Sequence, residues 1–367
     1  MTTRTLAIIV LLVCTLALFL PACGSGTENE NQPTPTVNLT TDARVAFIDT
    51  AGNVAIMNAD GSGVTALTTG GGATSLATSA DASLIAAEFA TGVRVFDAAG
   101  RLLFERQGAA SPTWATGAPR LAVAVGDAVL GLDAAGELEV TVEHARRASW
   151  SPDGTRLAVM ELVGENGTPV IVDAATGAKS PLSAEIEPHI PAYPIAWHPN
   201  GVAIAYRDRL YDLSTETQAT LPGIAVGWSP DGRMLMVTLP SDPSSGITTV
   251  RLLDATQGLK EVIGMEAPAS TVEPGWLYVQ RWVDWSPDGT RLVYMDPAVG
   301  QERVRVFNTV QISQDIHRNI KGELPDISPE GEFIVFMDTA RVWLLPVDGS
   351  ALQVIAEGTQ AHWIMRS

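Results

Sequence analysis

The chain has 367 residues, with 41 acidic and 23 basic side chains and a formal net charge of −18. Such an acidic protein is not expected to bind nucleic acid, or to lie on an anionic lipid surface, by electrostatic attraction. An apolar content of 46% beside only 17% charged residues indicates many buried strands with modest polar edges.

The first 22 residues have the pattern of an export signal. Arg4 precedes an apolar run from Leu6 to Leu20, which is short for a membrane span. The run ends in LPACG (residues 20–24), which resembles the lipobox of bacterial lipoproteins, although Pro21 departs from the small residue usual there. The resemblance implies acylation of Cys23 and anchoring to a membrane of the cell envelope. An ordinary secretory signal and an uncleaved anchor helix are the alternatives.

The segment that follows has the composition of a tether. Residues 24–37 lack apolar periodicity and are rich in Gly, Pro, Asn and Glu, which favours a solvated linker. Cys14 would leave with the signal, so the mature chain holds only Cys23 and no internal disulfide. We therefore divide the chain into a lipoprotein signal peptide (1–22), an acylated cysteine with a flexible linker (23–38) and one folded domain (39–367).

The folded domain contains an internal repeat. The sequence WSPDGTRLAV at 150–159 recurs as WSPDGTRLVY at 285–294 and as WSPDGRML at 228–235. Weaker copies begin at Trp197 and Ile327, and eroded copies at Thr78 and Trp114. Starting points at 78, 114 and 150 are evenly spaced, as repeats of one structural unit would be.

The motif predicts a tight turn between two strands. Its Pro sets φ near −65° and its Gly supplies a positive φ. An apolar strand, a turn and a second strand follow each copy, as at 92–97, 169–173 and 304–308, and a fourth short strand comes next. Four short strands in about 40 residues are typical of β-propeller blades.

The motif and its strand context resemble the TolB-type, WD-repeat-like propellers, which also supply the propeller of prolyl oligopeptidase-like enzymes. The resemblance covers about residues 40–367 and implies an all-β fold. Second strands of the repeat start near residues 44, 84, 120, 156, 202, 233, 291 and 332. We predict eight blades, with seven as the alternative if one weak repeat does not form. Residues 361–365 are expected to close the ring beside 44–49, which removes an exposed sheet edge.

No catalytic, cofactor-binding or metal-binding set stands out in the sequence. The Gly-x-Ser-x-Gly elbow and the phosphate-binding Gly-rich loop are missing, and the histidines are isolated from one another. Those histidines are His144, His189, His198, His317 and His362. The motif tryptophans are expected to pack between adjacent blades rather than to stack on a sugar.

Long connections provide the candidate binding face. Propeller geometry places the segments 183–194 and 265–280, between blades, on the same face as 163–168, 240–246 and 296–301, within blades. Loops held by a rigid scaffold commonly carry binding residues. The candidates are Glu185, Glu187, His189, Tyr193, Glu273, Trp276 and Tyr278. The alternative is that these loops cover blade edges and bury Trp276.

Two classes of function follow from these features. The first is a non-enzymatic, monomeric envelope lipoprotein that binds a protein or peptide through its long-loop face. The second is a glycan-binding propeller or a propeller-class hydrolase or lyase, which would gather carboxylates and histidines at the channel mouth.

Overall fold

The computed structural model describes residues 39, 42–164, 166–182, 193–239, 247–268, 281–296, 303–319 and 322–365. They all belong to one compact unit, Pro35–Ser367. Apart from a short 3₁₀ turn at Ala255–Gln257, the regular structure in these ranges is antiparallel β-strand. No helix in the described ranges has the length and apolar character needed to cross a membrane. The predicted signal peptide and Cys23 lie outside those ranges.

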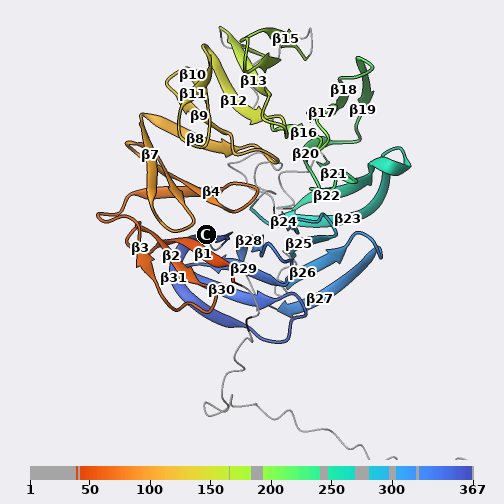
Figure 1. Cartoon of the computed structure of the whole chain (residues 1–367). Coiled ribbons are helices and arrows are strands. Elements are labelled where there is room, and N and C mark those ends of the chain that lie inside the picture. Colours follow the sequence, from red (N-terminus) through yellow and green to blue (C-terminus); the bar gives the residue numbers. More distant parts are fainter. Residues whose placement is uncertain are drawn as a thin grey trace, which may run out of the picture. The chain divides into compact units, whose positions relative to one another are not determined.

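Six sheets have four strands each, and the strands of every sheet follow one another in the chain (Figure 1). The first three sheets are β4 (Ala73–Thr78), β5 (Leu84–Phe89), β6 (Gly92–Asp97) and β7 (Leu102–Gln107); β8 (Ala109–Trp114), β9 (Leu121–Val125), β10 (Ala128–Leu132) and β11 (Leu138–Val142); and β12 (Ala145–Trp150), β13 (Arg156–Val163), β14 (Asn166–Asp173) and β15 (Lys179–Pro181). The other three are β16 (Ile195–Trp197), β17 (Ala203–Tyr206), β18 (Arg209–Asp212) and β19 (Thr217–Thr220); β20 (Ile224–Trp228), β21 (Met234–Thr238), β22 (Ile247–Asp254) and β23 (Lys260–Pro268); and β24 (Val283–Trp285), β25 (Arg291–Asp296), β26 (Arg303–Asn308) and β27 (Ser313–Asn319).

A seventh sheet joins the two ends of the domain. Its strands, in spatial order, are β28 (Glu323–Ile327), β29 (Phe333–Asp338), β30 (Arg341–Pro346), β31 (Gln353–Ile364), β1 (Arg44–Asp49), β2 (Val54–Asn58) and β3 (Thr65–Ala66). The first part of β31 pairs with β30, and its last part pairs with β1, where Trp363 lies opposite Val45. The predicted closure of the ring by the C-terminal segment is therefore confirmed. The number of eight blades stays a prediction.

The hydrophobic core lies between neighbouring sheets. Leu84 and Val93 of one sheet pack in the same cluster as Trp114 and Leu121 of the next. Ala158 packs in the same way with side chains of β16 and β17. Middle strands such as β5 and β21 are buried on both sides, whereas outer strands such as β15 and β19 are exposed. The sheets therefore depend on one another for burial.

Two predicted loop boundaries are wrong. The segment 163–168 is not a long loop, because β13 and β14 stay paired as far as Val163 and Asn166. A Cβ at position 167 would stand 2.6 Å from the sulfur of Met160, so Gly167 leaves room for the two strands to stay paired. The polar, glycine-containing composition of the segment had indicated a loop. Likewise, residues 265–268 belong to β23 and pair with β22. The remainder of that insertion, 269–280, lies outside the described ranges.

Candidate functional site

The Ser-Pro-Asp-Gly turns are built by local hydrogen bonds. The Ser151 hydroxyl donates to Asp153 Oδ1 at 2.6 Å and accepts from the Arg156 N–H at 2.9 Å. Gly154 adopts the positive φ, +68°, that the turn requires. The hydrogen bond from Ser151 is the main cause that holds the pKa of Asp153 below its usual value. The Asp of the motif is thus a turn residue, as predicted.

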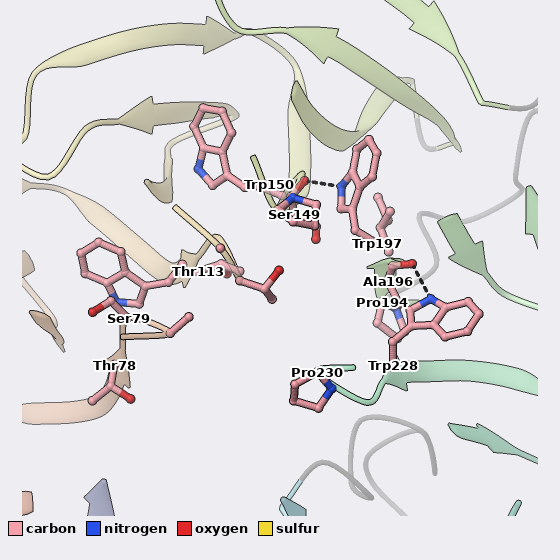
Figure 2. A pocket seen from close by; sticks show the side chains of 18 of the residues that line it. Thr78, Ser79, Thr113, Ser149, Trp150, Pro194, Ala196, Trp197, Trp228 and Pro230 are labelled. Atoms are coloured by element: carbon pink, nitrogen blue, oxygen red, sulfur yellow. Dashed lines mark hydrogen bonds between the residues drawn. The ribbon is translucent and has the colours of Figure 1, made fainter. Parts of the chain in front are cut away.

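The motif tryptophans connect successive sheets. In four cases the indole N–H donates to a backbone carbonyl of the preceding sheet at 3.0–3.2 Å. The accepting residue stands directly before the first residue of that sheet's own motif. Figure 2 shows two of these bonds. The pairs are Trp114 with Ala77, Trp197 with Ser149, Trp228 with Ala196, and Trp363 with Asp326. The expectation that these side chains pack between blades is confirmed for these four.

Trp150 is buried in a different way. Its side chain is 2% exposed, yet its indole nitrogen has no hydrogen-bond partner among the described residues. The ring lies over Gly131 of β10, where an added Cβ would stand 2.6 Å from ring atom Cζ2. Trp150 therefore contributes apolar packing and no indole hydrogen bond.

A cavity of about 1300 Å³ runs between the innermost strands. Its lining comes from β4, β8, β12, β16, β20, β24, β28 and the end of β31, from β9 and β10, and from the turns that follow the inner strands. Figure 2 shows part of this lining. A space of this size can enclose most of a small ligand or part of a peptide. It is the candidate functional site of the described chain.

One wall of the cavity is acidic. Asp284 on β24 accepts from the Ile327 N–H at 2.8 Å, and Asp326 on β28 accepts from the Trp363 N–H at 2.8 Å. Nδ1 of His362 lies 3.0 Å from Asp326 Oδ2. These carboxylates therefore link three consecutive inner strands, β24, β28 and β31.

The charge of Asp326 acts on the neighbouring Asp284. Asp284 is partly exposed to the cavity, but most of the space around its carboxyl is filled by protein. This burial, and next the charge of Asp326, raise the pKa of Asp284 well above its usual value. Asp284 therefore keeps its proton over a wider pH range than an exposed aspartate does.

This group was not predicted from the sequence, where His362 is isolated from the other histidines. Asp284 precedes Trp285, Asp326 precedes Ile327 and His362 precedes Trp363, so all three occupy the same position of the repeat. Comparing that position across the repeats would have revealed the group. Within the described ranges, no three His, Cys, Asp or Glu side chains are arranged to hold a metal ion.

The opposite part of the lining is basic. Arg146 and Arg147 of β12 are exposed and line the cavity. In chain order, at least two other sheets lie between the sheet that contains β12 and the sheets that contain the acidic strands β24 and β28. The cavity therefore has charges of opposite sign on different walls.

Tyr193 is the one predicted binding residue that the structure describes. It directly precedes β16, is half-buried and lines the cavity. Its ring meets that of Tyr206 edge-on, with centroids 6.2 Å apart, and the Arg207 guanidinium lies 5.5 Å from its centroid. The other candidates fall outside the described ranges: Glu185, Glu187, His189, Glu273, Trp276 and Tyr278.

Comparison with known proteins finds no matching protein-family model and no matching curated protein. Solved structures do match. Apo AztD from Citrobacter koseri is 12% identical, with 88% of this chain and 97% of that chain covered and a TM-score of 0.63. Dihydro-heme d1 dehydrogenase NirN is 12% identical, with coverages of 90% and 78% and a TM-score of 0.58.

Similarity at this level shows the fold alone. Oligogalacturonate lyase is 15% identical, covers 86% of this chain and 96% of its own, and has a TM-score of 0.50. These proteins have different roles and are all β-propellers, the fold to which the four-stranded antiparallel sheets found here belong. The chain therefore has the β-propeller fold, while its likeness to the TolB type stays a resemblance of the sequence motif.

Proposed function

We propose that this chain is a non-enzymatic lipoprotein of the cell envelope whose propeller binds a protein or peptide partner at the long-loop end of its channel. The observation that carries the proposal is the place of Tyr193, which belongs to the predicted insertion 183–194 and lines the cavity. A partner held by the long-loop face would thus have the cavity beside it.

The direction of the inner strands supports the choice of this end of the channel. Each inner strand runs toward its motif turn, and Tyr193 lies four residues before Trp197. Four extended residues span roughly 13 Å. Tyr193 is therefore well removed from the short-turn face, on the side from which the long connections leave.

The cellular location rests on the N-terminal sequence. The apolar run and the lipobox-like LPACG support export, cleavage before Cys23 and acylation of that cysteine. The linker 23–38 would hold the propeller a short distance from the membrane.

Capture of partners from solubilised envelopes tests the proposal. The bait is the full chain, compared with a variant that carries Tyr193→Ala, Trp276→Ala and Tyr278→Ala. A control variant carries Val64→Ala, Leu102→Ala and Val310→Ala, which remove exposed apolar side chains that do not line the cavity. We expect a partner that the wild type and the control retain and the first variant loses.

Other outcomes contradict parts of the proposal. A partner retained equally by all three baits would move the binding site away from the long-loop face. No partner at all would favour the glycan-binding or hydrolase and lyase alternative, for which Asp284, Asp326 and His362 are the groups to test. In that case Asp284→Asn should abolish turnover of a glycoside or lactone substrate, because it removes an acid at the cavity wall.

A further inference from the structure

Arg146 and Arg147 differ from most arginines of the described chain. Arg94, Arg120 and Arg251 form ion pairs with neighbouring glutamates. By contrast, the side chains of Arg146 and Arg147 make no hydrogen bond or ion pair with another described residue, although the chain carries a net charge of −18. Two adjacent positive charges thus face the cavity without protein partners.

A β-bulge places both side chains at the cavity. The pairing of β12 with β13 shifts between Arg146 and Ser149, and Arg147 adopts a φ of +59°. A bulge redirects side chains that would otherwise alternate between the two faces of a strand. Ser111 of β8 has a similar φ, +53°, three residues before its own motif tryptophan. The bulge is thus a feature of the scaffold, and the paired arginines are particular to β12.

The arginines lie near the proposed partner site. Arg146 stands four residues before Trp150, as Tyr193 stands four residues before Trp197. The two inner strands are adjacent, since the Trp197 indole donates to the Ser149 carbonyl at 3.0 Å. Arg146, Arg147 and Tyr193 therefore share one level of the channel on neighbouring walls.

We propose that Arg146 and Arg147 form an anion-binding site that receives a carboxylate or phosphate group of a ligand entering the channel. Guanidinium groups bind such planar or tetrahedral oxyanions through paired, charge-assisted hydrogen bonds. Charge attraction is stronger in a cavity walled by protein than in open water, and the charge of Asp326 across the channel repels the anion toward the arginines. The inference rests on the proposed function, because it names the chemistry of a partner group at the same end of the channel.

Titration of the full chain with two small anions provides the test. Tricarballylate represents carboxylates and pyrophosphate represents phosphates, with chloride at matched ionic strength as the reference. Tryptophan fluorescence reports binding, because Trp150, Trp197 and Trp228 line the same cavity. We expect a saturable change with at least one of the two oxyanions, weakened by added salt.

Two double variants locate the site. Arg146→Gln with Arg147→Gln should weaken binding at least tenfold. Arg101→Gln with Arg251→Gln removes the same charge from side chains that do not line the cavity and should leave binding unchanged. Unfolding of each variant in urea confirms that the fold is retained.

Either of two results would overturn the inference: neither oxyanion gives a saturable response beyond that of chloride, or both double variants weaken binding equally. A response to one oxyanion alone identifies the class of group. The partner capture uses Tyr193, Trp276 and Tyr278 and no arginine variant, while the titration needs no partner. The two proposals can therefore fail separately.

Discussion

Trp150 and Trp197 occupy the same motif position in adjacent sheets, and they allow the indole hydrogen bond to be measured. Both are buried, with 2% and 6% of the side chain exposed. Trp197 donates to the Ser149 carbonyl at 3.0 Å, whereas the Trp150 nitrogen has no partner among the described residues. Changing each to Phe removes a similar volume from the core, so the cost of lost packing is common to both variants.

The expected difference follows from the hydrogen bond. Trp197→Phe loses a hydrogen bond that stabilises the folded state by about 1 kcal/mol. Trp150→Phe removes an unpaired buried N–H and so relieves the folded state of a cost of about 1–3 kcal/mol. The Arg156 guanidinium, 4.9 Å from the Trp197 ring, acts in the same direction, because Phe offers it a smaller π face. Trp197→Phe should therefore lower the free energy of unfolding by about 2–4 kcal/mol more than Trp150→Phe does.

Urea unfolding followed by fluorescence and by far-UV circular dichroism measures this difference, provided that the two transitions coincide and the m values agree. Trp228→Phe is a second bonded case, because its indole donates to the Ala196 carbonyl at 3.2 Å. A cost for Trp150→Phe equal to or above that for Trp197→Phe would refute the assigned role of the indole bond.

Two further predictions concern the acidic wall and the ring closure. Burial and the Asp326 charge raise the pKa of Asp284, so the folded state retains a proton that the unfolded chain releases near pH 3.8. The contribution of this group to stability therefore falls as pH rises above that value, and Asp284→Asn should gain stability relative to wild type between pH 4 and pH 7 in urea unfolding; a relative loss would contradict the assignment. A chain ending at Gly358 lacks most of the β31 residues that pair with β1, so its urea midpoint should fall far below that of a control lacking only 366–367, and equal midpoints would contradict the closure.

Local motifs explain why so much of the fold was predictable. The turn around Ser151 is held by bonds between residues at most five apart, so the same letters produce the same turn at each copy. Repetition then identified the blade, and the unmatched strand near Arg44 with the final Trp363 indicated closure. The segment 163–168 was predicted wrongly because a polar, glycine-containing sequence resembles a loop, while the pairing of β13 with β14 extends through it.

The sequence by itself determined the repeat, the motif turns and the strand order, because these depend on hydrogen bonds and burial patterns between residues close in the chain. Only the tertiary structure decided which side chains share the cavity. Asp284 and Asp326 line it, and His362 contacts Asp326, because closing the ring brings β24, β28 and β31 side by side. Arg146 and Arg147 face the same space because pairing with β13 forces a bulge that no local pattern reveals.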